Sequence, residues 1–307
     1  MKKIHFQIFA IVALSLVLLV GFNRCSKLDV NSVSDEFSFV FLTDIHVQPE
    51  RRADEGFRQA VKVVNELNPD FVITGGDLIM DALGQSWERS DSLYNLYREI
   101  SADFTMPVYN TIGNHEIYGI YEKSGADTSH PEYGEKMFEK RLGPSYYAFE
   151  HKGWKFFILN SIEDTRKSRY IGLIDDAQID WIKKELAKTD SATPLVISTH
   201  IPIFTIFMQK YYGTTKANDS SLVVANGKEV IDLFAGHNLR LVLQGHLHTI
   251  EDIYVDGVHF LTGGAVSARW WTGPNHGYEE GFMMIRVKDD DFDWEYIDYG
   301  WEVEISE

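Results

Sequence analysis

Apolar runs rich in β-forming residues alternate with stretches of helical period in the first part of the chain. The first apolar run, Phe37 to Thr43, precedes a helical period over residues 53–67, and a second run, Phe71 to Gly75, precedes another helical period over residues 86–100. A third apolar run follows at residues 107–113. Strands and helices that alternate at this spacing predict βαβ units with buried parallel strands.

The second half of the chain has a different pattern. Residues 145–161 form two β-rich runs around a His-Lys-Gly turn, which predicts a hairpin. Helical periods at residues 175–188 and 227–234 lie on either side of an apolar run at 194–199, and residues 239–299 consist mostly of short β-rich runs. The pattern therefore favours a mixed α/β fold with two sheets packed together.

The first 25 residues form a segment of another kind. Lys2 and Lys3 precede an apolar run over residues 8–22, which is typical of an export signal. The run is long for a signal-peptide core and short for a membrane-spanning helix, so an uncleaved anchor is the alternative. Cys25, the one cysteine of the chain, follows this run and resembles the lipidated first residue of a bacterial lipoprotein; an incidental thiol is the alternative. We expect an exported protein, periplasmic or membrane-anchored.

These patterns predict the domain organisation and limit the partners. We expect a leader or anchor over residues 1–25, a polar tether over 26–36 and one domain over 37–307. The net charge of −17 argues against a nucleic-acid surface, because the field of the whole molecule repels polyanions. A membrane contact is expected only through the N-terminal segment, and a phosphate-bearing substrate has to be attracted locally. The sequence makes no prediction of the oligomeric state.

Polar side chains with metal-ligating or acid-base chemistry follow five of the β-rich runs. Ligands of open α/β sheets bind beyond the carboxyl ends of the strands, so we expect these side chains to converge. They are Asp44, His46, Asp77, Asn114, His115, His200, His246 and His248.

The chemical types in this set indicate a metal site. Oxygen and imidazole donors without a thiolate suit divalent Mn, Fe or Zn better than a structural zinc cage. The two aspartates, one asparagine and four of the histidines make two sets of four if one carboxylate bridges, as in hydrolytic sites with two ions roughly 3.5–4 Å apart. Each motif alone has an ordinary explanation as turn chemistry or a hydrogen-bonded histidine; their joint order is what favours the metal site.

The five motifs "TDIH", "GGDL", "GNHE", "STH" and "GHLH" occur in the order that resembles the calcineurin-like metallophosphoesterase superfamily, which includes purple acid phosphatases and class III cyclic-nucleotide phosphodiesterases. The resemblance extends roughly from Phe39 to Gly264. It implies a four-layer α/β/β/α fold, with two packed central mixed sheets flanked by helices, and a centre with two divalent metal ions.

The resemblance also implies roles for single residues. Asp44, His46 and His248 would bind the first ion, Asp77 would bridge, and Asn114, His200 and His246 would bind the second. His115 would lie over the site near the leaving group. The implied activity is that of a metal-dependent phosphoesterase, which hydrolyses small phosphomonoesters or phosphodiesters through a metal-bridging hydroxide; the N-terminal segment adds the expectation that this enzyme is exported. The alternative is a non-catalytic binding module on the same fold.

Substrate residues are harder to predict. The segment from Val266 to Tyr278 is rich in Gly, aromatic and polar residues, and its candidates for contact with substrate are Arg269, Trp270, Trp271 and His276. Alternatively, the two tryptophans cover a sheet edge. The segments 116–134 and 203–221 are candidates to cap the site, although residues 206–208 also fit a packed helix.

Overall fold

The computed structural model describes residues 36–303 of the chain. The expected leader or anchor, Cys25 and nearly all of the tether lie outside the described residues. Within residues 36–303, no helix is both long enough and apolar enough to cross a membrane.

The first sheet has five strands in the order β13-β12-β1-β2-β3. Strands β1 (Phe37–Leu42), β2 (Phe71–Thr74) and β3 (Val108–Tyr109) are parallel, as the alternating pattern predicted. Strands β12 (Gly281–Lys288) and β13 (Asp291–Asp298) add antiparallel neighbours on the other side of β1. β3 is shorter than its apolar run.

The second sheet has six strands in the order β10-β11-β9-β8-β5-β4 and is also mixed. The predicted hairpin is confirmed as β4 and β5, which pair antiparallel, with Lys152 and Gly153 at positive φ in the turn. The strands are β4 (Tyr147–His151), β5 (Trp154–Ile158), β8 (Pro194–Ser198), β9 (Asn238–Gln244), β10 (Glu251–Val255) and β11 (Val258–Thr262).

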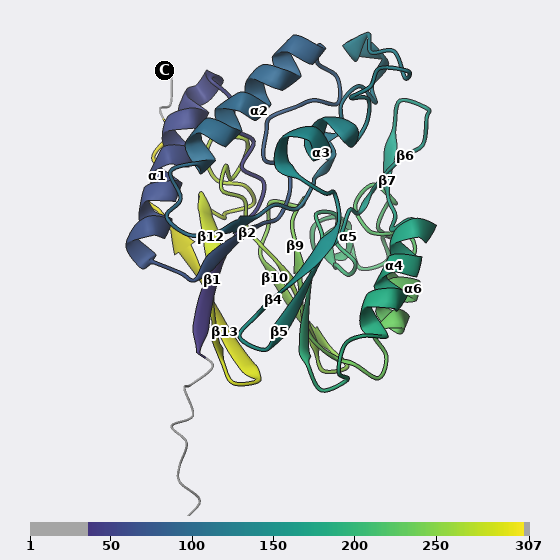
Figure 1. Cartoon of the computed structure of the whole chain (residues 1–307). Helices are drawn as coiled ribbons and strands as arrows, with labels where there is room; N and C mark the ends of the chain where they lie inside the picture. Colours follow the sequence, from purple (N-terminus) through teal and green to yellow (C-terminus); the bar gives the residue numbers. More distant parts are fainter. Residues whose placement is uncertain (1–35, 304–307) are drawn as a thin grey trace, which may run out of the picture. The chain divides into compact units, whose positions relative to one another are not determined.

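Helices cover the outer face of each sheet (Figure 1). Helices α1 (Ala53–Leu67) and α2 (Trp87–Ser101) pack on the first sheet, and α4 (Asp176–Leu186) and α6 (Gly227–Leu233) pack on the second. Helix α3 (Lys136–Leu142) and helix α5 (Phe207–Tyr212) are short. Three 3₁₀ turns complete the set, at Glu50–Arg52, Asn114–Glu116 and Glu122–Ser124.

The inner faces of the two sheets meet in an aromatic core. Side chains of β1 alternate between its two faces, so Phe37, Phe39 and Phe41 point inward while Val40 and Leu42 contact the helix layer. The Phe39 ring lies 5.7 Å from the ring of Phe156 in the opposite sheet. This packing confirms the four-layer α/β/β/α fold.

A two-stranded hairpin after β5 was not predicted. It consists of β6 (Ile162–Asp164) and β7 (Tyr170–Gly172). Gly172 docks it on the segment before α6: its N–H donates to Ser220 O (2.7 Å), and a Cβ there would lie 2.6 Å from Val223 O. The residue at this position therefore has to be glycine.

Candidate metal centre

The strand ends of both sheets bring the predicted polar residues to one place. Asp44 and His46 follow β1, and Asp77 follows β2 in the same sheet. His200 follows β8, and the pair His246 and His248 follows β9, in the other sheet. The remaining two, Asn114 and His115, form the 3₁₀ turn after β3.

The first group of potential metal ligands contains Asp44, His46 and His248, which are all buried. The Nε2 atom of His248 lies 3.2 Å from Asp44 Oδ1 and 3.1 Å from the Nε2 atom of His46. His46 Nε2 in turn lies 3.6 Å from Asp77 Oδ2, which connects this group to the next.

A second group contains Asp77, His200 and His246. His200 Nε2 lies 3.2 Å from Asp77 Oδ2, 3.1 Å from Asn114 Oδ1 and 3.2 Å from His246 Nδ1. Asn114 therefore lies beside this group. The neighbouring histidines His246 and His248 face different groups.

His115 lies beside both groups and is part of a third set with His46 and Asp77. Its backbone N–H donates to Asp77 Oδ1 at 2.9 Å, and its Nε2 atom lies 3.8 Å from Asp77 Oδ2. The ring Nδ1 atom bonds to Met80 O. With 19% of its side chain exposed, His115 is accessible from solvent, unlike the fully buried His46.

Backbone carbonyls fix the orientation of three imidazoles. Nδ1 of His200 bonds to Gly75 O (2.8 Å), Nδ1 of His248 bonds to Ala268 O, and Nε2 of His246 bonds to Ser221 O (2.9 Å). In each case the remaining ring nitrogen faces the centre. This arrangement is typical of metal-binding histidines, since the outer hydrogen bond selects the tautomer.

The charges of the centre are strongly coupled. Burial opposes the charged form of Asp44, but the nearby His248 holds the pKa of that carboxyl at about 2. Burial likewise opposes protonation of His200, but Asp77 raises the pKa of His200 to about 9. Burial and then the charge of His200 lower the pKa of His246 to about 4. Without metal, two carboxylate-imidazolium pairs therefore balance the charge, and divalent ions can replace these protons.

Comparison with known proteins places this geometry in a family. Residues 37–249 match the model of the calcineurin-like phosphoesterases. The chain belongs to this family. No curated protein matches the sequence.

Solved structures show the same fold at low sequence identity. A dimetal phosphatase from Danio rerio is 15% identical, with a TM-score of 0.59 and coverage of 86% of this chain and 99% of that chain. A purple acid phosphatase from yellow lupin (Lupinus luteus) is 16% identical, with a TM-score of 0.55 over 86% of this chain and 52% of that chain. GAP50, the anchor in the inner membrane complex of Plasmodium, is 13% identical, with a TM-score of 0.51 over 87% and 86%.

Several of the candidate ligand residues have left-handed backbone conformations. Positive φ angles, between 48° and 73°, occur in Asp44, His46, Asp77, His246 and His248. Such conformations cost about 1–3 kcal/mol each for residues other than glycine and cluster at functional sites. The fold therefore stores strain at the strand ends in order to aim these side chains.

Glu116 is a site residue that the sequence reasoning missed. It is fully buried, and its two carboxylate oxygens accept four backbone N–H groups, those of Asp77, Leu78, Ile79 and Gly113. Burial and then the charge of Asp77 raise the pKa of Glu116 to about 8, against the effect of these donors. Its place in the motif "GNHE" was the available signal; its partners could be identified only from the fold.

The four candidates for substrate contact have different positions. The Trp270 ring lies 4.8 Å from the His248 ring and is partly exposed, so it lines the centre. Trp271 is 1% exposed, and its indole N–H donates to Ile45 O and His46 O, so it stabilises the ligand loop from the core.

Arg269 and His276 lie further out. Arg269 is exposed, and its guanidinium forms no hydrogen bond or ion pair with another described residue. The His276 ring stacks on Tyr211 at 4.1 Å, so it joins its own loop to helix α5. Residues 207–212 form the short helix α5, with no buried residue, rather than a packed core helix.

Tyr170 of the β6–β7 hairpin also borders the centre and was not predicted. Its ring lies 6.3 Å from the ring of His246. The sequence gives no local signal for this contact, because it depends on how Gly172 docks the hairpin beside Ser221.

Proposed function

We propose that this protein hydrolyses phosphoesters with two divalent metal ions. The observation that carries the proposal is that imidazole nitrogens and side-chain oxygens, which are all potential metal ligands, face one another at the centre. His200 Nδ1 bonds to a carbonyl, so a neutral His200 presents a lone pair at Nε2, yet this atom faces Asp77 Oδ2 and Asn114 Oδ1. His248 Nε2 and Asp44 Oδ1 meet in the same way. Without metal, protons on His200 and His248 satisfy these contacts, and divalent cations can take the place of those protons, so the residues present fit metal ions.

In this proposal Asp77, whose carboxylate lies between the two groups, would help to hold both ions. Manganese, iron and zinc all suit these oxygen and imidazole donors. The first ion would be held by Asp44, His46 and His248, and the second by Asn114, His200 and His246.

When bound, such ions lower the pKa of water and neutralise phosphoryl oxygens. The chain itself supplies a proton donor. His115 Nδ1 bonds to Met80 O, which fixes the ring with Nε2 beside Asp77 Oδ2. When His115 is protonated, its Nε2–H can donate to the oxygen of the leaving group.

Metal exchange with phosphoester probes tests the activity. Dialysis against a chelator should abolish turnover of p-nitrophenyl phosphate and bis-p-nitrophenyl phosphate, and added Mn²⁺, Fe²⁺ or Zn²⁺ should restore it. Activity that resists chelation would contradict the metal mechanism. A metal-loaded protein that cleaves neither probe would contradict the hydrolase and favour a binding module.

Asp77→Asn should reduce kcat at least about 100-fold, because the amide weakens the carboxylate link between the two groups. Metal content by mass spectrometry should fall towards one ion per chain. The matched control is Asp232→Asn, at an exposed position on α6 paired with Lys228. Wild-type activity in Asp77→Asn would rule out a shared carboxylate.

We further propose that the protein is exported and stays at the membrane or in the periplasm. The support is the sequence of residues 1–25, with two lysines, an apolar run and Cys25. Mass spectrometry of the mature N-terminus distinguishes a cleaved signal, an uncleaved anchor and a lipidated Cys25. An unmodified full-length chain in the cytoplasmic fraction would refute export.

A further inference from the structure

An aromatic side chain lies beside each of the two groups of candidate ligands. The Trp270 ring lies 4.8 Å from the ring of His248 and 6.1 Å from the ring of His46. The Tyr170 ring lies 6.3 Å from the ring of His246, in the other group. The centre is therefore flanked by one flat apolar surface at each group of ligands.

Trp270 is held in place by contacts on both sides of its backbone. Arg51 Nη1 donates to Trp270 O at 2.8 Å. The next residue, Trp271, is anchored in the core by its hydrogen bonds to the carbonyls of Ile45 and His46. The indole of Trp270 is still 39% exposed, so it has a free surface that a ligand can cover.

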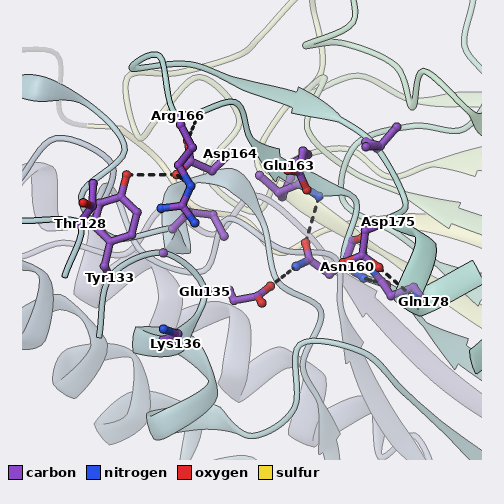
Figure 2. Close-up of a pocket in the computed structure, with 14 residues that line it drawn as sticks. Thr128, Tyr133, Glu135, Lys136, Asn160, Glu163, Asp164, Arg166, Asp175 and Gln178 are labelled. Carbon is purple, nitrogen blue, oxygen red and sulfur yellow. Dashed lines mark hydrogen bonds and ion pairs between the residues drawn. The ribbon is translucent and has the colours of Figure 1, made fainter. Parts of the chain in front are cut away.

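Tyr170 is fixed by the docking of its hairpin. The ion pair of Arg169 with Asp219 (3.1 Å) and the hydrogen bond of Gly172 N–H to Ser220 O join β7 to the segment that carries Ser221. On the other side of the hairpin, Asp164 accepts a hydrogen bond from Tyr133 at the edge of a cavity of about 160 Å³ (Figure 2).

The Tyr170 hydroxyl has no hydrogen-bond partner among the described residues, although the ring is half-buried. Among the same residues, no Lys or Arg lies within ion-pair distance of Asp44 or Asp77. Of the arginines nearest in sequence to the two aromatic residues, Arg169 pairs with Asp219, Arg51 binds the carbonyl of Trp270, and the exposed Arg269 forms no ion pair with a candidate ligand. Beside the candidate ligands, the described residues therefore place His115 and two aromatic rings, with no lysine or arginine paired to Asp44 or Asp77.

A phosphomonoester carries up to two negative charges and one organic group, whereas a phosphodiester carries one charge and two organic groups. We infer that this centre prefers phosphodiesters, with one substituent packed on Trp270, the other beside Tyr170, and the Tyr170 hydroxyl donating to an oxygen of the ester. This inference rests on the proposed function. In the reaction, water oxygen bonds to phosphorus and the P–O bond to one substituent breaks. The leaving oxygen takes a proton, which gives an alcohol and a phosphomonoester.

Binding of inert analogues to the metal-loaded protein tests the preference without turnover. Diphenylphosphinate, a monoanion with two aryl groups on phosphorus, stands for the diester. Phenylphosphonate in alkaline buffer, a dianion with one aryl group, stands for the monoester. Calorimetry should show about tenfold tighter binding of diphenylphosphinate, because the second aryl group gains an aromatic contact. Equal or tighter binding of phenylphosphonate would overturn the inference.

Variants identify the surfaces responsible. Trp270→Ala and Tyr170→Ala should each reduce the ratio of kcat/KM for bis-p-nitrophenyl phosphate over p-nitrophenyl phosphate about tenfold. Tyr170→Phe should keep part of the preference, since it loses only the hydroxyl. Tyr254→Ala and Trp294→Ala, at aromatic residues that contact none of the ligand groups, serve as matched controls and should keep the wild-type ratio.

The failures of the two proposals can be distinguished. If the metal-loaded wild type cleaves neither nitrophenyl ester, the proposed function fails. If it cleaves the monoester faster than the diester, the proposed function stands and the preference is wrong. Arg269→Ala could also abolish the binding of both phenylphosphonate and diphenylphosphinate. This result would show that the guanidinium of Arg269 holds the phosphoryl group, and it would overturn the inference.

Discussion

At the scale of single residues, the centre depends on side chains that hold the backbone in place as much as on the candidate metal ligands. Glu116 collects four N–H groups from the loops after β2 and β3 and so fixes where Asp77 and Asn114 point. In the sequence, Glu116 is the last residue of the motif "GNHE", two positions after the candidate ligand Asn114. A carboxylate in this role is hard to replace, because each released N–H would be buried without a partner.

Glu116→Ala should lower the free energy of unfolding by about 3–5 kcal/mol, because several buried N–H groups lose their acceptor. Urea denaturation of the chelated protein measures this loss separately from any effect on metal binding. Glu229→Ala, at an exposed position of α6, is the control and should stay within about 0.5 kcal/mol of the wild type. A loss in Glu116→Ala as small as in the control would show that the four hydrogen bonds are unimportant.

At the scale of elements, α1 reaches the centre through Trp271. Gly56 is the fourth residue of α1, and inside a helix glycine is normally unfavourable by about 1 kcal/mol relative to alanine. Here a Cβ would lie 2.2 Å from the Trp271 ring, whose indole N–H binds the His46 carbonyl. The missing side chain therefore makes room for the residue that stabilises the first ligand loop.

Gly56→Ala should destabilise the fold by about 1–3 kcal/mol, since the overpacked ring has to move. It should also weaken metal binding about tenfold through the loop that carries His46. Thermal unfolding and metal titration measure the two effects. Lys62→Ala, exposed on the same helix, is the control. A higher unfolding midpoint for Gly56→Ala would mean that helix propensity prevails over the clash.

The segment 116–134 is attached to its neighbouring helices by a buried charge network. Glu132 contacts Arg141 of α3 (2.9 Å) and the Trp87 indole N–H of α2 (2.8 Å), and also pairs with Lys140. Only 7% of the Glu132 side chain is exposed. The network holds this segment against α2 and α3.

Glu132→Gln should lower stability at neutral pH by about 1–3 kcal/mol, because the charge-assisted contacts of Glu132 with Arg141 and Lys140 are lost while Arg141 keeps its ion pair with Asp91. Burial opposes the charge of Glu132, but the hydrogen bonds from Lys140, Trp87 and Arg141 lower its pKa from 4.5 to about 2. Because the folded state favours the charged form of Glu132, this carboxylate stabilises the fold fully above about pH 4.5. The contribution is lost as the pH falls towards 2 and Glu132 becomes protonated. Urea denaturation at several pH values should show a deficit that shrinks in acid, whereas exposed Glu122→Gln should show none. A deficit independent of pH would contradict this account.

At the scale of the whole molecule, the candidate ligands join the two sheets. Asp44 and Asp77 follow strands of one sheet, and His200, His246 and His248 follow strands of the other. In a molecule with a net charge of −17, this edge is where cations would supply the local attraction that a phosphoester needs. Metal binding and folding should therefore be coupled.

Divalent metal at about 1,000 times its Kd should stabilise the fold by about 4 kcal/mol per site. The unfolding midpoint should then rise by about 10 °C, as scanning calorimetry with and without chelator would measure. Asp77→Asn should lose most of this rise. A midpoint that is insensitive to metal in the wild type would contradict a centre that bridges the two sheets.

The sequence by itself determined the alternation of strands and helices, the two-sheet architecture and the set of side chains that meets at the strand ends. Each of these follows from local order: side chains alternate along a strand, and Asp44, His200 or His248 comes directly after an apolar run. Only the tertiary structure decided that Trp271 is a buried support, that Tyr170 borders the centre and that Ser221 fixes His246. These contacts join residues 25 to 226 positions apart, and they depend on packing that no local pattern encodes.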